Sequence, residues 1–242
     1  MPEQALVGVI LLVRHGQASF GSTDYDVLSP AGARQARCLG AALAARGITP
    51  ASVISGTLRR QRASAAALVE QAGWPLEVSV DPAWDEFELS GLVAGTPDGQ
   101  APRDRGAFQD ALEAGMRRWA GSVASSAGTA AAPAGTVGPP PAGMSFPLGG
   151  MSFAAFAARA ESALRTVAAR QPKGATTLVT TSGGVIGWIA ASLLGAGVEQ
   201  WIRLNRVCVN TGVTKLVAGR RGISLVAFND HSHLSPAEIT YR

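Results

Sequence analysis

The sequence is poor in cysteine, since only Cys38 and Cys208 occur among its 242 residues. Two cysteines form one disulfide at most, which excludes a disulfide-stabilised secreted scaffold and makes a reducing cytoplasm the expected location. Charged residues are also few, at 16%, whereas 47% of the residues are hydrophobic. This balance excludes an intrinsically disordered chain and argues against a coiled coil, which needs a larger share of charged residues.

Lysine is nearly absent too: Lys173 and Lys215 are the two lysines, and all other Lys/Arg positions are arginine. The net charge is only +4, and the arginines are scattered along the chain. A nucleic-acid surface is typically a concentrated basic patch, so no nucleic-acid partner is expected. The N-terminus lacks the basic region of a signal peptide. The apolar stretch from Thr176 to Val198 is interrupted by glycines, which favours a strand and a helix over a membrane span.

Strand and helix patterns alternate along the chain. Short aliphatic runs are typical of buried strands, and Ser29 followed by Pro30 marks a helix start that Gly47 ends. Strands are expected at 7–13, 53–54, 76–80, 176–181, 212–218 and 223–228, and helices at 30–46, 58–72, 107–120, 152–170 and 184–194. The alternation predicts an α/β fold, a three-layer sandwich around a largely parallel sheet.

One segment departs from this pattern. Residues 122–150 consist almost entirely of Ala, Gly, Pro and Ser and carry no charge. Such a composition cannot bury much surface, so we expect a low-complexity surface insertion without chemistry. The whole chain, residues 1–242, is then expected to form a single domain that carries this insertion.

Residues suited to an anion follow the predicted strands. Ligands of such sheets bind at the carboxyl ends of the strands. The first strand is followed by Arg14 and His15, the second by an arginine pair that includes Arg60, and the third by a group of carboxylates. Ser182 and Gly183 follow the fourth strand and begin a helix, whose free N–H groups favour an anion. This set suits a phosphoryl group, whereas one histidine without cysteine serves a metal ion poorly.

These segments resemble the histidine phosphatase superfamily, also called the phosphoglycerate mutase-like family. LLVRHGQASF is similar to its Arg-His-Gly signature, and Arg60 in SGTLRRQRASAAAL is similar to its second phosphate arginine. WDEFELSG resembles the segment that carries the family's acid and places Glu86 there. LVTTSGGVI resembles the strand, turn and helix that usually read Ser-His-Gly-Gly, while NTGVTKL and FNDHSHL resemble late family segments. The resemblance covers the chain apart from residues 122–150 and implies a phosphoglycerate mutase-like fold.

One departure from the family pattern concerns Ser182, which stands where the family usually carries a second histidine. That histidine is a cationic donor to the phosphoryl group, whereas serine donates one hydrogen bond and brings no charge. Losing one preorganised donor commonly costs about 10²–10³ in rate. A serine at this position is also a common helix cap, a role that is compatible with a place in the pocket.

The resemblance implies a mechanism without a metal ion or an organic cofactor. His15 attacks phosphorus and becomes a phosphohistidine, while Arg14 and Arg60 hold the equatorial oxygens. Glu86 protonates the leaving alkoxide and then deprotonates water. The Gly183 N–H and Ser182 complete the phosphate pocket. Two other carboxylates, Asp85 and Glu88, lie close enough in sequence to take the role of the acid.

The sequence thus predicts a metal-independent phosphatase for a small phosphorylated substrate. One alternative is a phosphoglycerate mutase, although Glu86-Phe87-Glu88-Leu89 replaces the Glu-Arg-His-Tyr-Gly-type stretch expected there. Another is a phospho-ligand binding or regulatory protein that has lost turnover. His233, or less specifically His231, is a candidate accessory residue if the C-terminal tail folds back over the site. The sequence indicates neither the substrate nor the oligomeric state.

Overall fold

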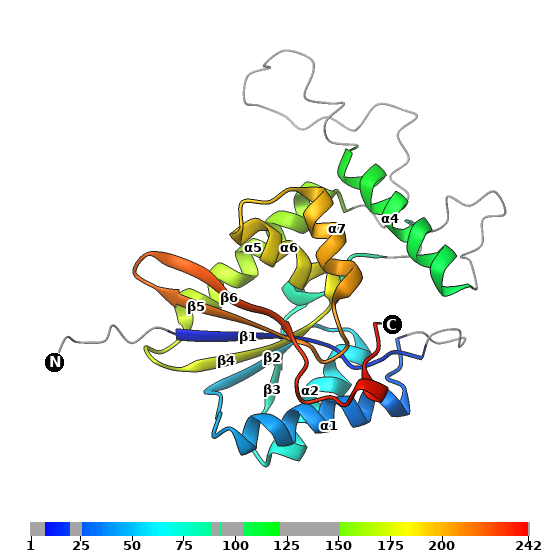
Figure 1. Ribbon diagram of the computed structural model, residues 1–242. Helices are drawn as coiled ribbons and strands as arrows, with labels where there is room; N and C mark the ends of the chain where they lie inside the picture. Colours follow the sequence, from blue (N-terminus) through cyan, green and yellow to red (C-terminus); the bar gives the residue numbers. More distant parts are fainter. Residues whose placement is uncertain (1–7, 20–25, 89–91, 93–103, 122–150, 242) are drawn as a thin grey trace. The chain divides into compact units, whose positions relative to one another are not determined.

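A computed structural model describes residues 8–19, 26–88, 92, 104–121 and 151–241 (Figure 1). The chain falls into two compact units, Met1–Glu86 with Arg159–Arg242 and Phe87–Ala158. The predicted insertion at 122–150 lies outside the described residues, and the single domain stays a prediction.

The first unit contains one six-stranded sheet with the order β3-β2-β4-β1-β5-β6. Its strands are β1 (Gly8–Arg14), β2 (Ser52–Ser55), β3 (Val78–Val80), β4 (Thr176–Thr181), β5 (Val213–Gly219) and β6 (Gly222–Asp230). β1 and β2 both pair in parallel with β4, and β3 pairs in parallel with β2. β5 and β6 extend the sheet in the antiparallel sense. The prediction of an α/β fold around a largely parallel sheet is confirmed.

Helices cover both faces of this sheet (Figure 1). α1 (Pro30–Ala45) and α2 (Arg59–Ala72) lie on one face, and α6 (Gly183–Leu193) and α7 (Val198–Val207) lie on the other. Ser29 accepts a hydrogen bond from the Gly32 N–H and caps α1, as its sequence predicts. α7 was not predicted, and two short 3-10 turns, η1 (Pro82–Trp84) and η2 (Pro236–Glu238), complete the unit.

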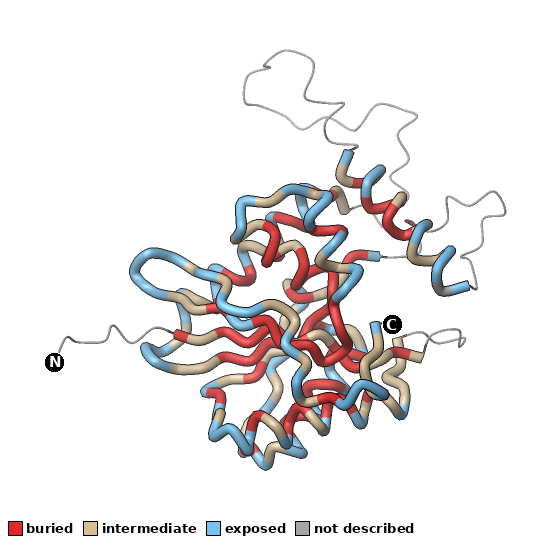
Figure 2. Tube along the Cα trace, viewed as in Figure 1, coloured by how far each residue is buried: buried red, intermediate tan, exposed pale blue. Residues whose placement is uncertain are grey.

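The core lies along β1, whose side chains alternate between the two faces of the sheet. Leu11 and Val13 pack in a buried cluster with Leu39 of α1 and Leu68 of α2. The alternate residue Ile10 is also fully buried. A strand that is buried on both faces takes a continuous aliphatic sequence. Figure 2 shows that the buried segments converge on this central region.

The second unit is held by aromatic residues. α4 (Arg105–Gly121) carries Trp119, whose ring lies 5.2 Å from Phe87 and 5.5 Å from both Phe153 and Phe156. The last two begin α5 (Phe153–Arg170), which continues into the first unit. Edge-to-face and tilted pairs at these distances stabilise a small core.

The start of α1 packs closely on the loop after β1. A Cβ at Gly32 would lie 2.2 Å from the Gln17 carbonyl oxygen, and a Cβ at Gly16 would lie 2.3 Å from the Gly32 carbonyl oxygen. Backbone therefore meets backbone here, and only glycine permits it.

We expect Gly32→Ala to lower the free energy of unfolding by about 2–3 kcal/mol, because the new Cβ would meet backbone atoms of Gln17, which cannot move aside as a flexible side chain could. Urea unfolding followed by circular dichroism measures it. Gly121→Ala is the control, since a Cβ there meets no atom within 4 Å, and it should leave stability unchanged or slightly raised. A Gly32→Ala protein as stable as wild type would contradict the close packing.

Candidate active site

His15 lies directly after β1, at the carboxyl end of the sheet. Its backbone N–H donates to the Thr181 carbonyl at the end of β4 (2.9 Å), and its carbonyl accepts from the Asn210 side-chain amide (3.0 Å). On the ring, Nδ1 lies 2.7 Å from the Gly16 carbonyl oxygen. A carbonyl oxygen only accepts, so Nδ1 carries the proton and Nε2 keeps its lone pair.

Arg60 lies against this lone pair. It stands in the first turn of α2, where its Nε donates to His15 Nε2 (3.2 Å). Its Nη1 pairs with Asp26 Oδ1 (2.7 Å), and the side chain is 8% exposed. Asp26 Oδ2 also accepts from the Arg59 N–H at the start of α2 (2.9 Å). One carboxylate thus fixes both the helix start and the guanidinium that faces the imidazole.

These surroundings keep His15 neutral. Burial lowers the pKa of His15 well below 6.5, and the positive charges of Arg60 and Arg14 lower the pKa further. The hydrogen bond to Gly16 acts in the opposite direction and is the smaller effect. A neutral imidazole whose Nε2 carries a lone pair in place of a proton is the nucleophilic form of histidine.

Arg14 and Gly183 lie side by side. The Arg14 guanidinium donates to the Cys208 carbonyl, and a Cβ at Gly183 would lie 3.5 Å from Arg14 Nε. Among the described residues, Arg14 Nε is buried without a hydrogen-bond acceptor. A buried donor without a partner is uncommon and suits a group that binds there. Gly183 is the first residue of α6, so its N–H points out of the helix start.

Glu86 reaches the same helix start. Its Oε2 accepts from the Gly184 N–H at 2.9 Å. The two neighbouring carboxylates differ from it. Asp85 accepts from the backbone N–H and the hydroxyl of Thr57, and it thereby orders the turn before α2. Glu88 belongs to the second unit.

Ser182 occupies the N-cap position of α6 and is 1% exposed. Its side chain makes no capping hydrogen bond, which corrects the prediction that it caps the helix. Instead, its Oγ accepts from Gln61 Nε2 at 2.9 Å. The Gln61 side chain is completely buried and also comes from the first turn of α2.

Comparison with known proteins decides the family. The sequence profile of the histidine phosphatase superfamily (branch 1) matches residues 10–131 and 112–231. This chain belongs to the histidine phosphatase superfamily. No curated protein shows a significant match to its sequence.

Solved structures of histidine phosphatase-like fold are similar along nearly the whole chain. A mycobacterial glucosyl-3-phosphoglycerate phosphatase is 23% identical with a TM-score of 0.59, covering 91% of this chain and 98% of the other. A phosphoserine phosphatase mutant from Entamoeba histolytica is 19% identical with a TM-score of 0.61, covering 94% and 100%. Phosphoglycerate mutase from Bacillus anthracis is 14% identical with a TM-score of 0.62, covering 95% and 96%. At these identities the likeness shows the shared fold.

The histidine phosphatase fold thus brings several of the predicted site residues to one end of the sheet. His15 contacts Arg60, Arg14 lies beside Gly183, and Glu86 contacts the next residue of α6. Within the described parts of the chain, no helix is long and apolar enough to cross a membrane. Those same parts contain no cluster of three or more His, Cys, Asp or Glu side chains that could hold a metal ion.

The C-terminal segment contributes contacts that the sequence did not indicate. The Thr240 hydroxyl donates to Asn210 Oδ1 (2.9 Å), and Asn210 in turn holds the His15 carbonyl. Gln35 Nε2 donates to the Glu238 carbonyl (2.7 Å), while its Oε1 accepts from the Gln17 N–H (2.9 Å). The segment therefore folds back onto α1 and the loops beside His15. These partners lie far apart in sequence, so no local pattern reveals them.

The two remaining histidines lie on this C-terminal segment. His233 Nε2 is 2.9 Å from Thr211 Oγ1, and the Thr211 N–H donates to the Arg14 carbonyl (3.0 Å). His231 Nδ1 donates to the Asn229 carbonyl (2.7 Å). His233 is thus connected to the site through Thr211.

His233 gives the fold an expected pH dependence. Burial is the main cause that lowers its pKa from 6.5 to about 4, and Asp230 opposes the shift. The unfolded chain takes up a proton on this residue below pH 6.5, whereas the folded protein does so only near pH 4. Folding stability is therefore complete above pH 6.5 and is lost as the pH falls towards 4.

We expect this residue to account for a loss of about 2 kcal/mol in unfolding free energy between pH 8 and pH 5. His233→Gln keeps a partner for Thr211 and cannot titrate, so it should be less sensitive to acid by that amount. Urea unfolding at both pH values measures the difference. Equal acid sensitivity in the two proteins would contradict the buried, neutral imidazole.

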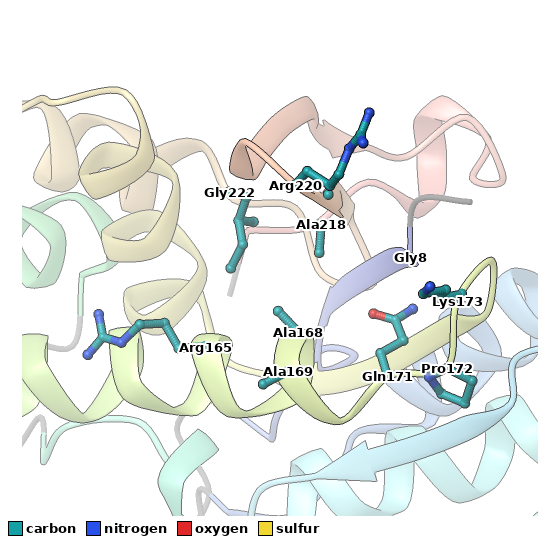
Figure 3. Close-up of a pocket in the computed structure, with 12 residues that line it drawn as sticks. Gly8, Arg165, Ala168, Ala169, Gln171, Pro172, Lys173, Ala218, Arg220 and Gly222 are labelled. Carbon is teal, nitrogen blue, oxygen red and sulfur yellow. The ribbon is translucent and has the colours of Figure 1, made fainter. Parts of the chain in front are cut away.

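A cavity of about 440 Å³ lies at the start of β1, the end of the strand that is opposite to His15 (Figure 3). Gly8, Gln171, Lys173, Arg165 and Arg220 are among its lining residues. None of the candidate site residues lines it, so this cavity is separate from the site around His15.

Proposed function

We propose that this histidine phosphatase-like protein is a metal-independent phosphomonoesterase that transfers the phosphoryl group to His15. The observation that carries the proposal is the neutral His15 ring, with Nδ1 bound to the Gly16 carbonyl and Nε2 facing Arg60. The same end of the sheet holds the Arg14 guanidinium, so a dianionic phosphoryl group meets cations beside a nucleophile.

The first step is an in-line displacement at phosphorus. His15 Nε2 forms a bond to phosphorus while the ester P–O bond breaks. Arg14 and Arg60 bind the equatorial oxygens and balance the negative charge of the transition state. For this contact, the Arg60 Nε–H must turn from the imidazole to the phosphoryl group. The ion pair between Nη1 and Asp26 keeps the guanidinium near the site during this rotation.

Glu86 handles the proton in both steps. As a carboxylic acid it protonates the leaving alkoxide, and as a carboxylate it then takes a proton from the attacking water. The water oxygen bonds to phosphorus, the N–P bond breaks, and inorganic phosphate leaves with His15 restored. The contact between Glu86 and the Gly184 N–H supports this role, because it holds the carboxyl group at the start of α6.

We further propose that Ser182 stands where the superfamily usually carries its second histidine. Its position at the start of α6, next to Gly183, supports this alignment. The Ser182 hydroxyl, one neutral donor, then takes the place of a cationic donor beside the Gly183 N–H. A lower rate of phosphoryl transfer follows from the missing charge.

A second candidate is a phospho-ligand binding protein without turnover. The uncharged Ser182 favours it, because binding of an anion survives the loss of one charge more readily than transition-state stabilisation does. A phosphoglycerate mutase is a third alternative, and an assay with 3-phosphoglycerate separates it from the other two.

Hydrolysis of p-nitrophenyl phosphate in the presence of EDTA, with acid-labile phosphoenzyme trapped in parallel, tests the proposal. We expect turnover together with a phosphoenzyme. Binding of inorganic phosphate without turnover on any of a panel of phosphomonoesters would favour the binding protein. Turnover that EDTA abolishes would contradict a metal-independent mechanism.

The wider setting is also proposed. We infer that the substrate is a small phosphorylated compound, not a nucleic acid, and that the chain forms one domain. A cytoplasmic location is supported by the two free thiols, Cys38 and Cys208. Burial raises the pKa of the Cys208 thiol to about 12, so this thiol is uncharged beside the site.

A further inference from the structure

Gln61 is a completely buried amide for which the mechanism above has no use. It follows Arg60 in α2 and points to the start of α6, where its Nε2 lies 2.9 Å from Ser182 Oγ. Gly56 makes room for it, because a Cβ there would lie 2.0 Å from Gln61 Oε1. Any side chain at position 56 would therefore exclude the Gln61 amide from its present position.

The orientation of the Gln61 amide follows from its other contacts. Nε2 lies 3.2 Å from the Trp84 carbonyl oxygen, which only accepts hydrogen bonds. Oε1 lies on the side of the Leu58 N–H (3.4 Å), which only donates. The nitrogen of the amide therefore faces Ser182, and the opposite assignment would place two acceptors against each other.

This orientation fixes the direction of the hydrogen bond to Ser182. The amide N–H donates, so Ser182 Oγ accepts and its own proton remains to be donated. Among the described residues, no acceptor receives that proton, although Ser182 is 1% exposed. A buried hydroxyl with an unused proton at the start of a helix suits an oxygen atom of a bound anion.

We propose that Gln61 is a positioning residue that makes Ser182 a donor to the phosphoryl group. This inference rests on the proposed function of the site. Without Gln61, the Ser182 hydroxyl can rotate and donate to a backbone or side-chain acceptor instead of the ligand. With Gln61, one lone pair of Oγ is occupied and the proton points away from the amide.

A double-mutant cycle on the full-length protein tests the proposal, with the affinity for inorganic phosphate measured by titration calorimetry. We expect Ser182→Ala to weaken phosphate binding about tenfold and Gln61→Met to weaken it about three- to tenfold. Because Gln61 acts through Ser182, the double variant should bind within about twofold of Ser182→Ala alone. The ratio of kcat to KM for p-nitrophenyl phosphate should follow the same non-additive pattern.

Gln171→Met is the matched control. Gln171 is also an amide that donates to backbone carbonyls, those of Val9 and Ala175, but it lies at the cavity of Figure 3. This variant should be less stable than wild type and should bind phosphate equally well. Loss of affinity in proportion to lost stability, in Gln61→Met and Gln171→Met alike, would assign Gln61 a structural role and overturn the proposal.

A second variant covers the case in which Gln61→Met fails to fold. Gln61→Glu keeps the shape and presents an acceptor to Ser182, so the serine proton turns towards residue 61 and is lost to phosphate. The same substitution in Ser182→Ala reports only the effect of the added charge. A larger loss in the wild-type background than in Ser182→Ala supports the proposal, and equal losses overturn it.

The outcomes also separate this inference from the proposed function. Phosphate binding by wild type with independent, multiplicative losses in the cycle removes the inference and leaves the role of His15 standing. An unchanged affinity in Ser182→Ala does the same. No phosphate binding and no turnover in wild type would remove both.

Discussion

His15→Ala should lower kcat/KM for p-nitrophenyl phosphate by about 10⁴-fold or more and should abolish the acid-labile phosphoenzyme. The variant lacks the nucleophile, so the remaining arginines can bind the ester but have no group to accept the phosphoryl transfer. Steady-state hydrolysis and acid-quench trapping with labelled substrate measure the two effects in one set of samples.

The affinity of this variant for inorganic phosphate shows whether activity is lost because the nucleophile is missing or because the site no longer folds. His15→Ala should still bind inorganic phosphate, since Arg14 and Arg60 supply the charge. His231→Ala is the control, because among the described residues His231 hydrogen-bonds only to the Asn229 carbonyl, and its kinetics should match wild type. Undiminished turnover in His15→Ala would refute the phosphohistidine route.

Arg60→Ala has the second largest expected effect, a fall in kcat/KM of about 10³-fold. The substitution removes a donor that is 8% exposed and held in place by Asp26. It also removes a positive charge that lowers the pKa of His15, although burial remains the larger cause. The acid limb of the pH profile should therefore move to higher pH, because His15 becomes protonated more easily.

Two further variants accompany this measurement. Arg60→Lys keeps the charge but loses the planar guanidinium, so it should recover only a small part of the activity. Arg62→Ala removes an exposed arginine from the same helix and should leave kcat/KM unchanged. If Arg62→Ala were as damaging as Arg60→Ala, the effect would come from the overall charge of α2 and not from the contact with His15.

Most of the fold could be predicted because its signals are local. The helix start at Ser29 and Pro30 was correct, and the strand that was expected at 176–181 is β4 with the same bounds. α7 was missed, since its N-cap is Gly197 without a side-chain hydrogen bond. A segment without a cap or a proline gives no local start signal.

The site was predicted only as far as its residues follow strands. Arg14 is the last residue of β1, and His15 and Ser182 come directly after β1 and β4. The rule that ligands bind at the carboxyl ends of parallel strands therefore predicted that these residues lie close together. Asp26 and Asn210 were not identified, because their partners, Arg60 for Asp26 and His15 for Asn210, lie far away in the sequence and no spacing rule connects them. The role expected of Ser182 as a cap was wrong for the same reason, since the competing partner, Gln61, lies on a different helix.

The position of β1 in the sheet also bears on how the chain is made. Its two neighbours are β4, where Val9 faces Thr176, and β5, where Gly8 faces Ala218. During synthesis on the ribosome, β2 and β3 emerge early and can pair with each other. β1 can pair only after β4 and β5 have emerged, which is much later. Such distant pairing makes folding slow and leaves an aliphatic strand exposed in the nascent protein. His15, at the end of that strand, therefore reaches its working position only after β4 and β5 have been synthesised.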